Sequence, residues 1–182
     1  MTFVLQSTGW HASTQFLFLR TRDLSTRAQI NLKGTFAFDA LSPNGKMLYL
    51  IQHRTIQDVN HYVVRGYDLN ARRLLPGRIA DKSQQSWVMQ GWAVDRVTSP
   101  AGRWAYTLYA NQGGTPFVHA LDTVKGVAHC VGIPWPATDP NQNEVYNFRL
   151  TLAGTKLAVR MGIGGDVYRF IDTSNWTVST PG

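Results

Sequence analysis

The sequence predicts an all-β fold in which similar antiparallel sheets stack against one another, and three observations lead to this prediction. A strand-like stretch that begins at Phe36 returns in altered form from Trp92 and again from Val145. Aromatic residues make up 12% of the 182 residues, which include 16 glycines and 8 prolines, a composition typical of strands joined by many turns. One turn glycine recurs in each copy, at Gly45, Gly102 and Gly154. A copied unit of roughly fifty residues predicts a β-propeller, complete or partial.

A β-sandwich is the alternative fold, because it also spaces short strands regularly. A sandwich does not predict a long repeat, however, whereas a propeller blade has two apolar faces that only neighbouring blades can bury. We therefore expect blades of four antiparallel strands in a single domain that covers residues 1–182.

The unit that begins at Phe36 is the clearest of the blades. Its Ser42-Pro43-Asn44-Gly45 segment favours a tight reversal, since proline presets φ and Asn-Gly readily takes positive φ. We expect its four strands at 36–42, 46–53, 61–69 and 73–79.

The two later units follow the same plan. We expect their strands at 93–99, 103–110, 116–122, 126–133, 144–151, 155–161, 166–172 and 176–180. An aspartate ends the third strand of each complete unit, at Asp68, Asp122 and Asp172. Such an aspartate can cap the following turn, so we interpret these residues as structural.

The first unit is predicted to be shorter. Its DLSTR segment at Asp23 matches DLNAR at Asp68, which places strands at 2–8, 15–23 and 27–32 and leaves no first strand. The blades are then approximately 1–33, 34–81, 90–134 and 144–180. Three interpretations stay open: a fragment of a longer propeller, a closed four-bladed ring with one short blade, and two chains that pair their open edges.

The middle units resemble the repeats of TolB-type and YVTN-type bacterial propellers, a WD-like class. The resemblance rests on SPNGKMLYL followed by YDLNARRLL, and on SPAGRWAYTL followed by HALDTVKGV. The last unit departs from it, because Leu152-Ala153-Gly154 stands where Ser-Pro-x-Gly is expected. The resemblance implies a bacterial and extracytoplasmic protein, with its targeting segment absent from this chain. It transfers no catalytic residue, because propellers host unrelated functions.

The net charge of +7 and the pI of about 9.9 allow an acidic partner. The basic residues are spread over every unit, so we do not expect nucleic acid as the partner. No apolar run is long enough to span a bilayer, and the start lacks the pattern of a secretory signal. The single cysteine, Cys130, alternates with apolar residues and is expected to pack as a small hydrophobe.

His53, Asp58 and His61 are the first candidate binding residues, because they share the connection between the second and third strands of one unit. Such connections line one end of a propeller, so the three side chains could form a polar site or hold a metal ion there. The alternative is a solvated loop in which the aspartate caps a turn. Of the other histidines, His119 and His129 are expected to face each other across neighbouring strands.

The two longest irregular segments, 81–91 and 134–144, supply the other candidates. Each contains tryptophan among amides or acids, a mixture that suits recognition. The candidate binding residues there are Trp87, Trp135, Asn141 and Asn143. The alternative is that both tryptophans wedge between blades.

We therefore expect a non-catalytic binding or scaffold module that contacts a protein or small ligand through its loop end or an open blade edge. We expect no cofactor and no metal. The alternative is a propeller enzyme, such as a hydrolase or lactonase-like protein, with a polar or metal site near the axis. The enzyme alternative requires acidic side chains from several blades to meet at one site. The chain has only 11 Asp and Glu residues, which disfavours such a site.

Overall fold

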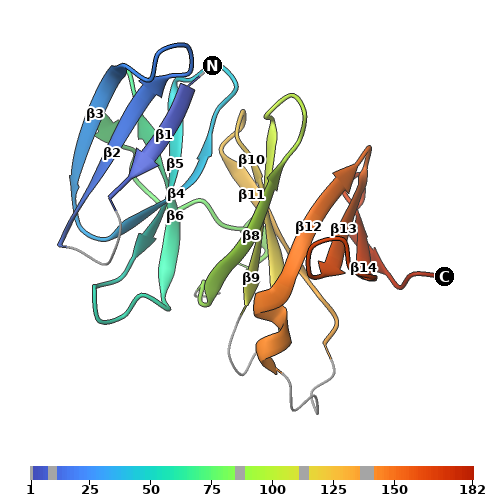
Figure 1. Cartoon of the computed structure of the whole chain (residues 1–182). Coiled ribbons are helices and arrows are strands. Elements are labelled where there is room, and N and C mark those ends of the chain that lie inside the picture. The colour runs from blue at the N-terminus through green and yellow to red at the C-terminus, as the bar shows by residue number, and fades with distance from the viewer. Residues whose placement is uncertain (1, 8–11, 85–88, 111–114, 136–141) are drawn as a thin grey trace.

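The computed structural model describes residues 2–7, 12–84, 89–110, 115–135 and 142–182, and it confirms the all-β prediction. Four antiparallel sheets follow one another along the chain, the first with three strands and the others with four. Figure 1 shows them side by side, from the N-terminal sheet at the left to the C-terminal sheet at the right. They do not close into a ring, so the chain forms a partial propeller. We call the sheets blades 1 to 4.

The strands follow chain order from one edge of each blade to the other. Blade 1 contains β1 (Thr2–Gln6), β2 (Ser13–Arg20) and β3 (Thr26–Lys33). Blade 2 contains β4 (Phe36–Leu41), β5 (Met47–His53), β6 (Tyr62–Asp68) and β7 (Arg73–Leu74). Blade 3 contains β8 (Trp92–Thr98), β9 (Trp104–Ala110), β10 (Phe117–Asp122) and β11 (Val127–Gly132). Blade 4 contains β12 (Phe148–Ala153), β13 (Lys156–Met161), β14 (Val167–Asp172) and β15 (Thr177–Ser179). Two 3-10 helices, η1 (Lys82–Gln84) and η2 (Gln142–Asn147), precede β8 and β12.

The repeated Ser-Pro-x-Gly turn is held by its serine. The Oγ atom of Ser42 accepts a hydrogen bond from Met47 N at 2.9 Å, and Ser99 Oγ does the same for Trp104 N at 3.0 Å. The glycine of the first turn, Gly45, has a φ of +66°, where a side chain would be strained. These turns therefore explain why the first two strands of blades 2 and 3 pair closely.

Two predicted strands have different bounds in the structure. The segment before Phe148 forms η2 rather than a strand. The last strand of blade 2 is interrupted after Leu74, because Pro76 cannot donate a backbone hydrogen bond and Gly77 has a φ of +80°. Ladder pairing resumes where Ile79 N donates to Val64 O at 2.8 Å.

The aspartate pattern needs one correction in blade 1. Leu24 N donates to Arg20 O at 2.9 Å, just as Gly126 N donates to Asp122 O at 2.8 Å. Arg20 therefore occupies the place of the strand-ending aspartate, and Asp23 lies within the turn that follows. The matching pentapeptides are out of register by three residues, because Arg20 N donates to Ser25 O at 2.9 Å across a turn as long as the one that pairs Asp68 with Arg73.

Alternating residues of each strand bury an apolar core between successive blades. Blades 1 and 2 share Phe16, Phe18, Ile30, Phe36, Leu48, Leu50 and Tyr67. Blades 2 and 3 share Ile51, Tyr62, Val64, Tyr109 and Phe117, among others. Blades 3 and 4 share Tyr106, Leu108, Val118, Ala120, Val131, Phe148, Leu150, Leu157, Val159 and Ile171. Stacking thus buries apolar faces that an isolated blade would expose.

A polar side chain on β1 bonds to the backbone of β4 in the next blade, and one on β8 bonds to the backbone of β12. The amide of Gln6 in β1 donates to Phe36 O at 3.1 Å and accepts from Phe38 N at 2.8 Å. The carboxylate of Asp95 in β8 accepts from Leu150 N at 2.7 Å. These contacts satisfy backbone groups on the open edges of β4 and β12 and fix where the blades meet.

Candidate functional site

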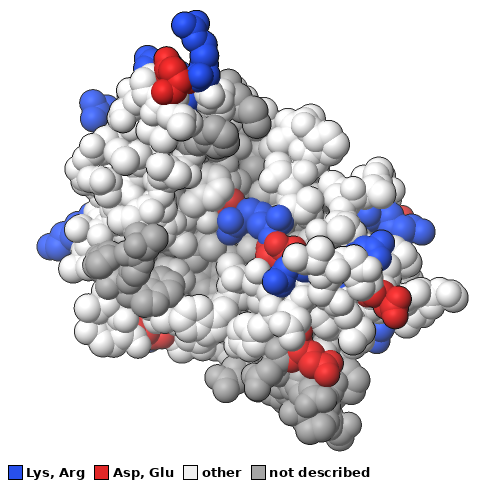
Figure 2. Space-filling model, in the orientation of Figure 1, with Lys and Arg blue, Asp and Glu red and all other residues white. Residues whose placement is uncertain are grey.

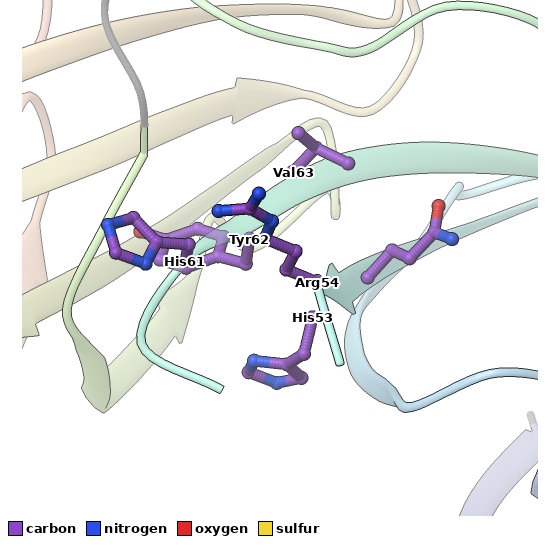
Figure 3. Close-up of a pocket in the computed structure, with 6 residues that line it drawn as sticks. His53, Arg54, His61, Tyr62 and Val63 are labelled. Carbon is purple, nitrogen blue, oxygen red and sulfur yellow. The ribbon is translucent and has the colours of Figure 1, made fainter. Parts of the chain in front are cut away.

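A pocket of about 400 Å³ lies where β5 and β6 of blade 2 meet their connecting loop. Its described lining comes from both strand ends and comprises Gln52, His53, Arg54, His61, Tyr62 and Val63. Figure 3 shows the Arg54 guanidinium above Tyr62, with the imidazole rings of His61 and His53 well apart. The pocket therefore combines a cation and two imidazoles with the side chains of Tyr62 and Val63.

The His53 imidazole is held by the loop that it begins. It is 8% exposed, and its Nδ1 lies 2.6 Å from Val59 O. A carbonyl only accepts, so Nδ1 carries the donating hydrogen. Burial lowers the pKa of His53, against the opposing effect of that hydrogen bond, which favours a neutral ring with its lone pair on Nε2.

Asp58 organises the rest of the loop. Its backbone N donates to Thr55 Oγ1 at 2.9 Å, and its Oδ1 accepts from His61 Nδ1 at 2.7 Å. Its second carboxylate oxygen lies 3.6 Å from Arg54 Nη1. The hydrogen bond from His61 is the main reason that the pKa of Asp58 falls below its usual value. The carboxylate therefore orients the imidazole and stays ionised at neutral pH.

The pocket rests on an aromatic stack that crosses into blade 3. The Tyr62 ring stacks on Tyr109 at 4.8 Å between centroids, and Tyr109 stacks on Phe117 at 5.1 Å. Burial raises the pKa of Tyr62 and Tyr109 well above the ordinary value, so both hydroxyls stay protonated. The inter-blade core thus gives the pocket a rigid floor.

The predicted candidates fall into two groups. The structure places His53, Asp58 and His61 in one loop, with His53 and His61 in the pocket lining. Trp135 lies elsewhere, packed against Phe148 at 5.5 Å and Tyr168 at 5.3 Å at the junction of blades 3 and 4. Trp87 and Asn141 lie outside the described residues, and Asn143 belongs to η2, where its side chain is not described.

The expected pairing of His119 with His129 is wrong. The register places His119 opposite Cys130 and His129 opposite Ala120, so the two rings point to opposite faces of blade 3. His129 packs on Trp176 at 4.9 Å, whereas His119 is 0% exposed. A displacement of one residue in a strand reverses the face to which a side chain points.

Sequence reasoning missed the pocket residues Arg54 and Tyr62. Arg54 directly follows His53 at the strand end, which is a signal that could have been used. Tyr62 gave no signal of its own, because its role depends on Tyr109, which is 47 positions away (109 minus 62).

A second polar cluster joins blades 2 and 3 near their first strands. The carboxylate of Asp39, which is fully buried, lies 3.1 Å from Arg96 Nη2 and accepts from Thr107 Oγ1 at 3.1 Å. Arg96 Nε donates to the same hydroxyl at 3.0 Å. Because Arg96 and Thr107 both contact Oδ1 of Asp39 across the blades, we interpret the cluster as an inter-blade brace. Among the described residues, Oδ2 of Asp39 has no hydrogen-bond partner.

The described residues contain no group of three or more His, Cys, Asp or Glu side chains placed to hold a metal ion. In that same part of the chain, no helix is long and apolar enough to cross a membrane. On the face seen in Figure 2, lysine and arginine side chains are scattered, and several lie beside acidic residues. This face therefore offers no continuous basic surface.

No protein-family model matches the chain, and no curated protein matches it either. Solved structures do match. The Dos1 propeller matches with a TM-score of 0.58 and 8% identity, over 98% of this chain and 45% of that one. TolB from Acinetobacter baumannii matches with a TM-score of 0.51 and 16% identity, over 98% and 40%. A putative 6-phosphogluconolactonase from Bacteroides uniformis gives 0.52 and 16%, over 97% and 50%.

These likenesses confirm the β-propeller fold and its similarity to TolB-type propellers. The chain spans 40 to 50% of the length of these three structures. At identities of 8 to 16% the likeness concerns the fold alone, and the similar proteins differ in function.

Proposed function

We propose that this chain is a non-catalytic binding module whose ligand enters the blade 2 pocket and presents an acidic group next to an apolar one. The observation that carries the proposal is the lining itself, in which Arg54 stands beside the side chains of Tyr62 and Val63. Mostly apolar pockets with a few fixed polar groups are typical ligand sites.

The charges around Arg54 favour an acidic ligand. Its side chain is 73% exposed, and its carboxylate contact with Asp58 is long at 3.6 Å. Asp58 already accepts a shorter bond of 2.7 Å from His61. The guanidinium can therefore turn toward a ligand carboxylate without leaving Asp58 unpaired, and an arginine can bind such a group through two parallel hydrogen bonds.

The test uses N-acetylphenylalanine, which joins a carboxylate to an aromatic ring, and its neutral amide. We expect the acid to shift the NMR signals of His53, His61 and Val63, and Arg54→Ala to weaken its binding by about tenfold or more, the effect of losing a charge-assisted hydrogen bond. Arg73→Ala, which removes an exposed arginine from β7, should leave binding unchanged. Equal binding of acid and amide, or an unchanged affinity in Arg54→Ala, would refute the proposed ligand class.

The alternative function is that of a hydrolase, and one contact favours it. The Asp58 carboxylate holds Nδ1 of His61 at 2.7 Å, the arrangement that orients an imidazole as a general base. Hydrolysis of a simple lactone or of p-nitrophenyl acetate that disappears in His61→Gln would support this function over binding alone. A rate that matches the buffer in both proteins would leave the binding module as the better account.

A further inference from the structure

We infer that the outward face of blade 1 is an interface between two copies of this chain. This face, which we call the leucine face, consists of Leu5, Leu17 and Leu19 with the amides Gln15, Gln29 and Asn31. Its residues alternate with Phe16, Phe18 and Ile30, which pack toward blade 2. Leu5 lies opposite Leu17, and Gln15 lies opposite Asn31, so these pairs share the face that points away from the rest of the molecule.

The position of Leu5 is an inter-blade position in every other blade. Leu5 lies opposite Leu17, three residues before Arg20, which stands in the place of the strand-ending aspartate. The residues opposite the positions three places before Asp68, Asp122 and Asp172 are Leu50, Thr107 and Val159. Those side chains are 0%, 1% and 0% exposed, whereas Leu5 is 52% exposed. A position that the preceding blade covers in blades 2 to 4 thus carries a half-exposed leucine in blade 1 of the 182-residue chain, which marks it as a contact surface of this chain.

The outward face of blade 4 has a different chemistry. Arg149 lies opposite Arg160, and Lys156 lies on the same face with its Nζ 4.7 Å from the Phe170 ring centroid. Among the described residues, none of these three cations has a carboxylate within salt-bridge distance. A head-to-tail contact between copies would bury these cations against leucines that offer no carboxylate to balance their charge, which is strongly unfavourable.

The leucine face suits contact with its own copy instead. None of its six residues is charged, and Lys33 lies opposite Ser13 at one end of the same sheet. Gln15 already donates to Asn31 at 3.1 Å, and amides can both donate and accept across a two-fold axis. Two copies that each carry a charge of +7 repel least where they meet through such an uncharged patch, and two-fold dimers use one patch twice.

The size of the face predicts a weak dimer. Strands of five to eight residues at ordinary strand dimensions give a face of about 27 by 14 Å. That is about 400 Å² per copy, roughly half of a standard interface. We therefore expect reversible association in the micromolar range or weaker.

Sedimentation velocity of the 182-residue chain from about 5 to about 500 μM tests this inference. The mass should rise from 20.4 kDa toward twice that value as the concentration increases. Leu5→Lys should raise the dissociation constant at least tenfold, since it sets two like charges against each other. Thr151→Lys is the matched control, because it adds the same charge to the exposed outer face of blade 4, and it should leave the association unchanged.

A charge-swap experiment tests the two-fold geometry. Leu17→Lys and Leu17→Glu should each be monomeric alone, and their mixture should form a heterodimer that weakens with salt. Circular dichroism melts establish that each variant is folded. A wild-type chain that stays monomeric over the whole range overturns the inference. Dimers that survive Leu5→Lys and Leu17→Lys, or that are lost in Thr151→Lys, overturn it as well.

Discussion

At the scale of single residues, burial decides which histidines stay neutral. The two ring nitrogens of His119 have no hydrogen-bond partner among the described residues. Burial lowers the pKa of His119, while Asp39 opposes that effect and Arg96 adds to it. The folded protein therefore holds this ring in its uncharged form.

Acid should destabilise the protein through this histidine and, for the same reason, through His53, whose pKa burial also lowers. Because the folded pKa lies below the ordinary value near 6.5, the unfolded chain takes up the proton first as the pH falls. Stability is then intact above about pH 6.5 and is lost as the pH falls from there through the folded pKa. We expect the denaturation midpoint in urea to decrease between pH 7 and pH 5, where carboxylates stay ionised.

His119→Leu should flatten this dependence. Equilibrium urea curves at several pH values measure the effect. An equally steep pH dependence in His119→Leu would contradict this account.

Residue geometry was predictable where neighbours in the chain set it. Asp58 and His61 stand three positions apart, and a tight loop joins their side chains. The brace between Asp39 and Arg96 was not predicted, because it joins two blades and depends on how their first strands align. The Tyr62–Tyr109 stack was missed for the same reason.

At the scale of elements, the strand-ending aspartates act as turn caps of unequal strength. Asp122 is 1% exposed, and its Oδ1 accepts from Val124 N and Lys125 N, both at 3.0 Å. Its Oδ2 accepts from Arg103 Nη2 at 2.9 Å. Burial alone would raise the pKa of Asp122, but these hydrogen bonds together lower it. Asp172 caps an exposed turn, where its Oδ1 accepts from the backbone N and the Oγ of Ser174.

Asp122→Ala should therefore cost more stability than Asp172→Ala. We expect a loss of about 1–3 kcal/mol for Asp122→Ala, because buried backbone donors and an arginine lose their acceptor. Asp172→Ala should show a clearly smaller loss, since water can replace the exposed carboxylate. Urea denaturation of both variants at pH 7 measures the difference, and equal losses would show that burial does not set the strength of the cap.

The strands themselves were largely predictable from repeat spacing and turn chemistry. The Ser-Pro-x-Gly turns marked the first hairpins of blades 2 and 3. Without that motif, β12 extends to Ala153, which lies opposite Lys156, two residues beyond the predicted end at Thr151. The interruption at Pro76 was readable in principle, because a proline cannot continue a ladder.

At the scale of the whole molecule, the chain is an open series of blades in which each blade buries apolar side chains against its neighbours. Stability in such arrays is approximately the sum of unit and interface terms. Blade 3 has partners on both sides, and β9 and β10 are buried along almost their whole length. Blade 1 has three strands, one covered face and an exposed Leu5. Local stability should therefore be uneven along the chain.

Native-state hydrogen exchange should reveal this order. We expect the amides of β2 and β3 to exchange through openings of lower free energy than those of β9 and β10, because opening blade 1 breaks one inter-blade interface and opening blade 3 breaks two. Gln6→Ala should lower the protection of blade 1 further, since it removes both side-chain hydrogen bonds to β4, and should leave β9 and β10 unchanged. The measurement is made at low protein concentration, where the chain is monomeric and contact between two leucine faces therefore cannot protect blade 1. Equal protection in blades 1 and 3 would mean that the four sheets open as one unit and that the sum of interfaces does not describe their stability.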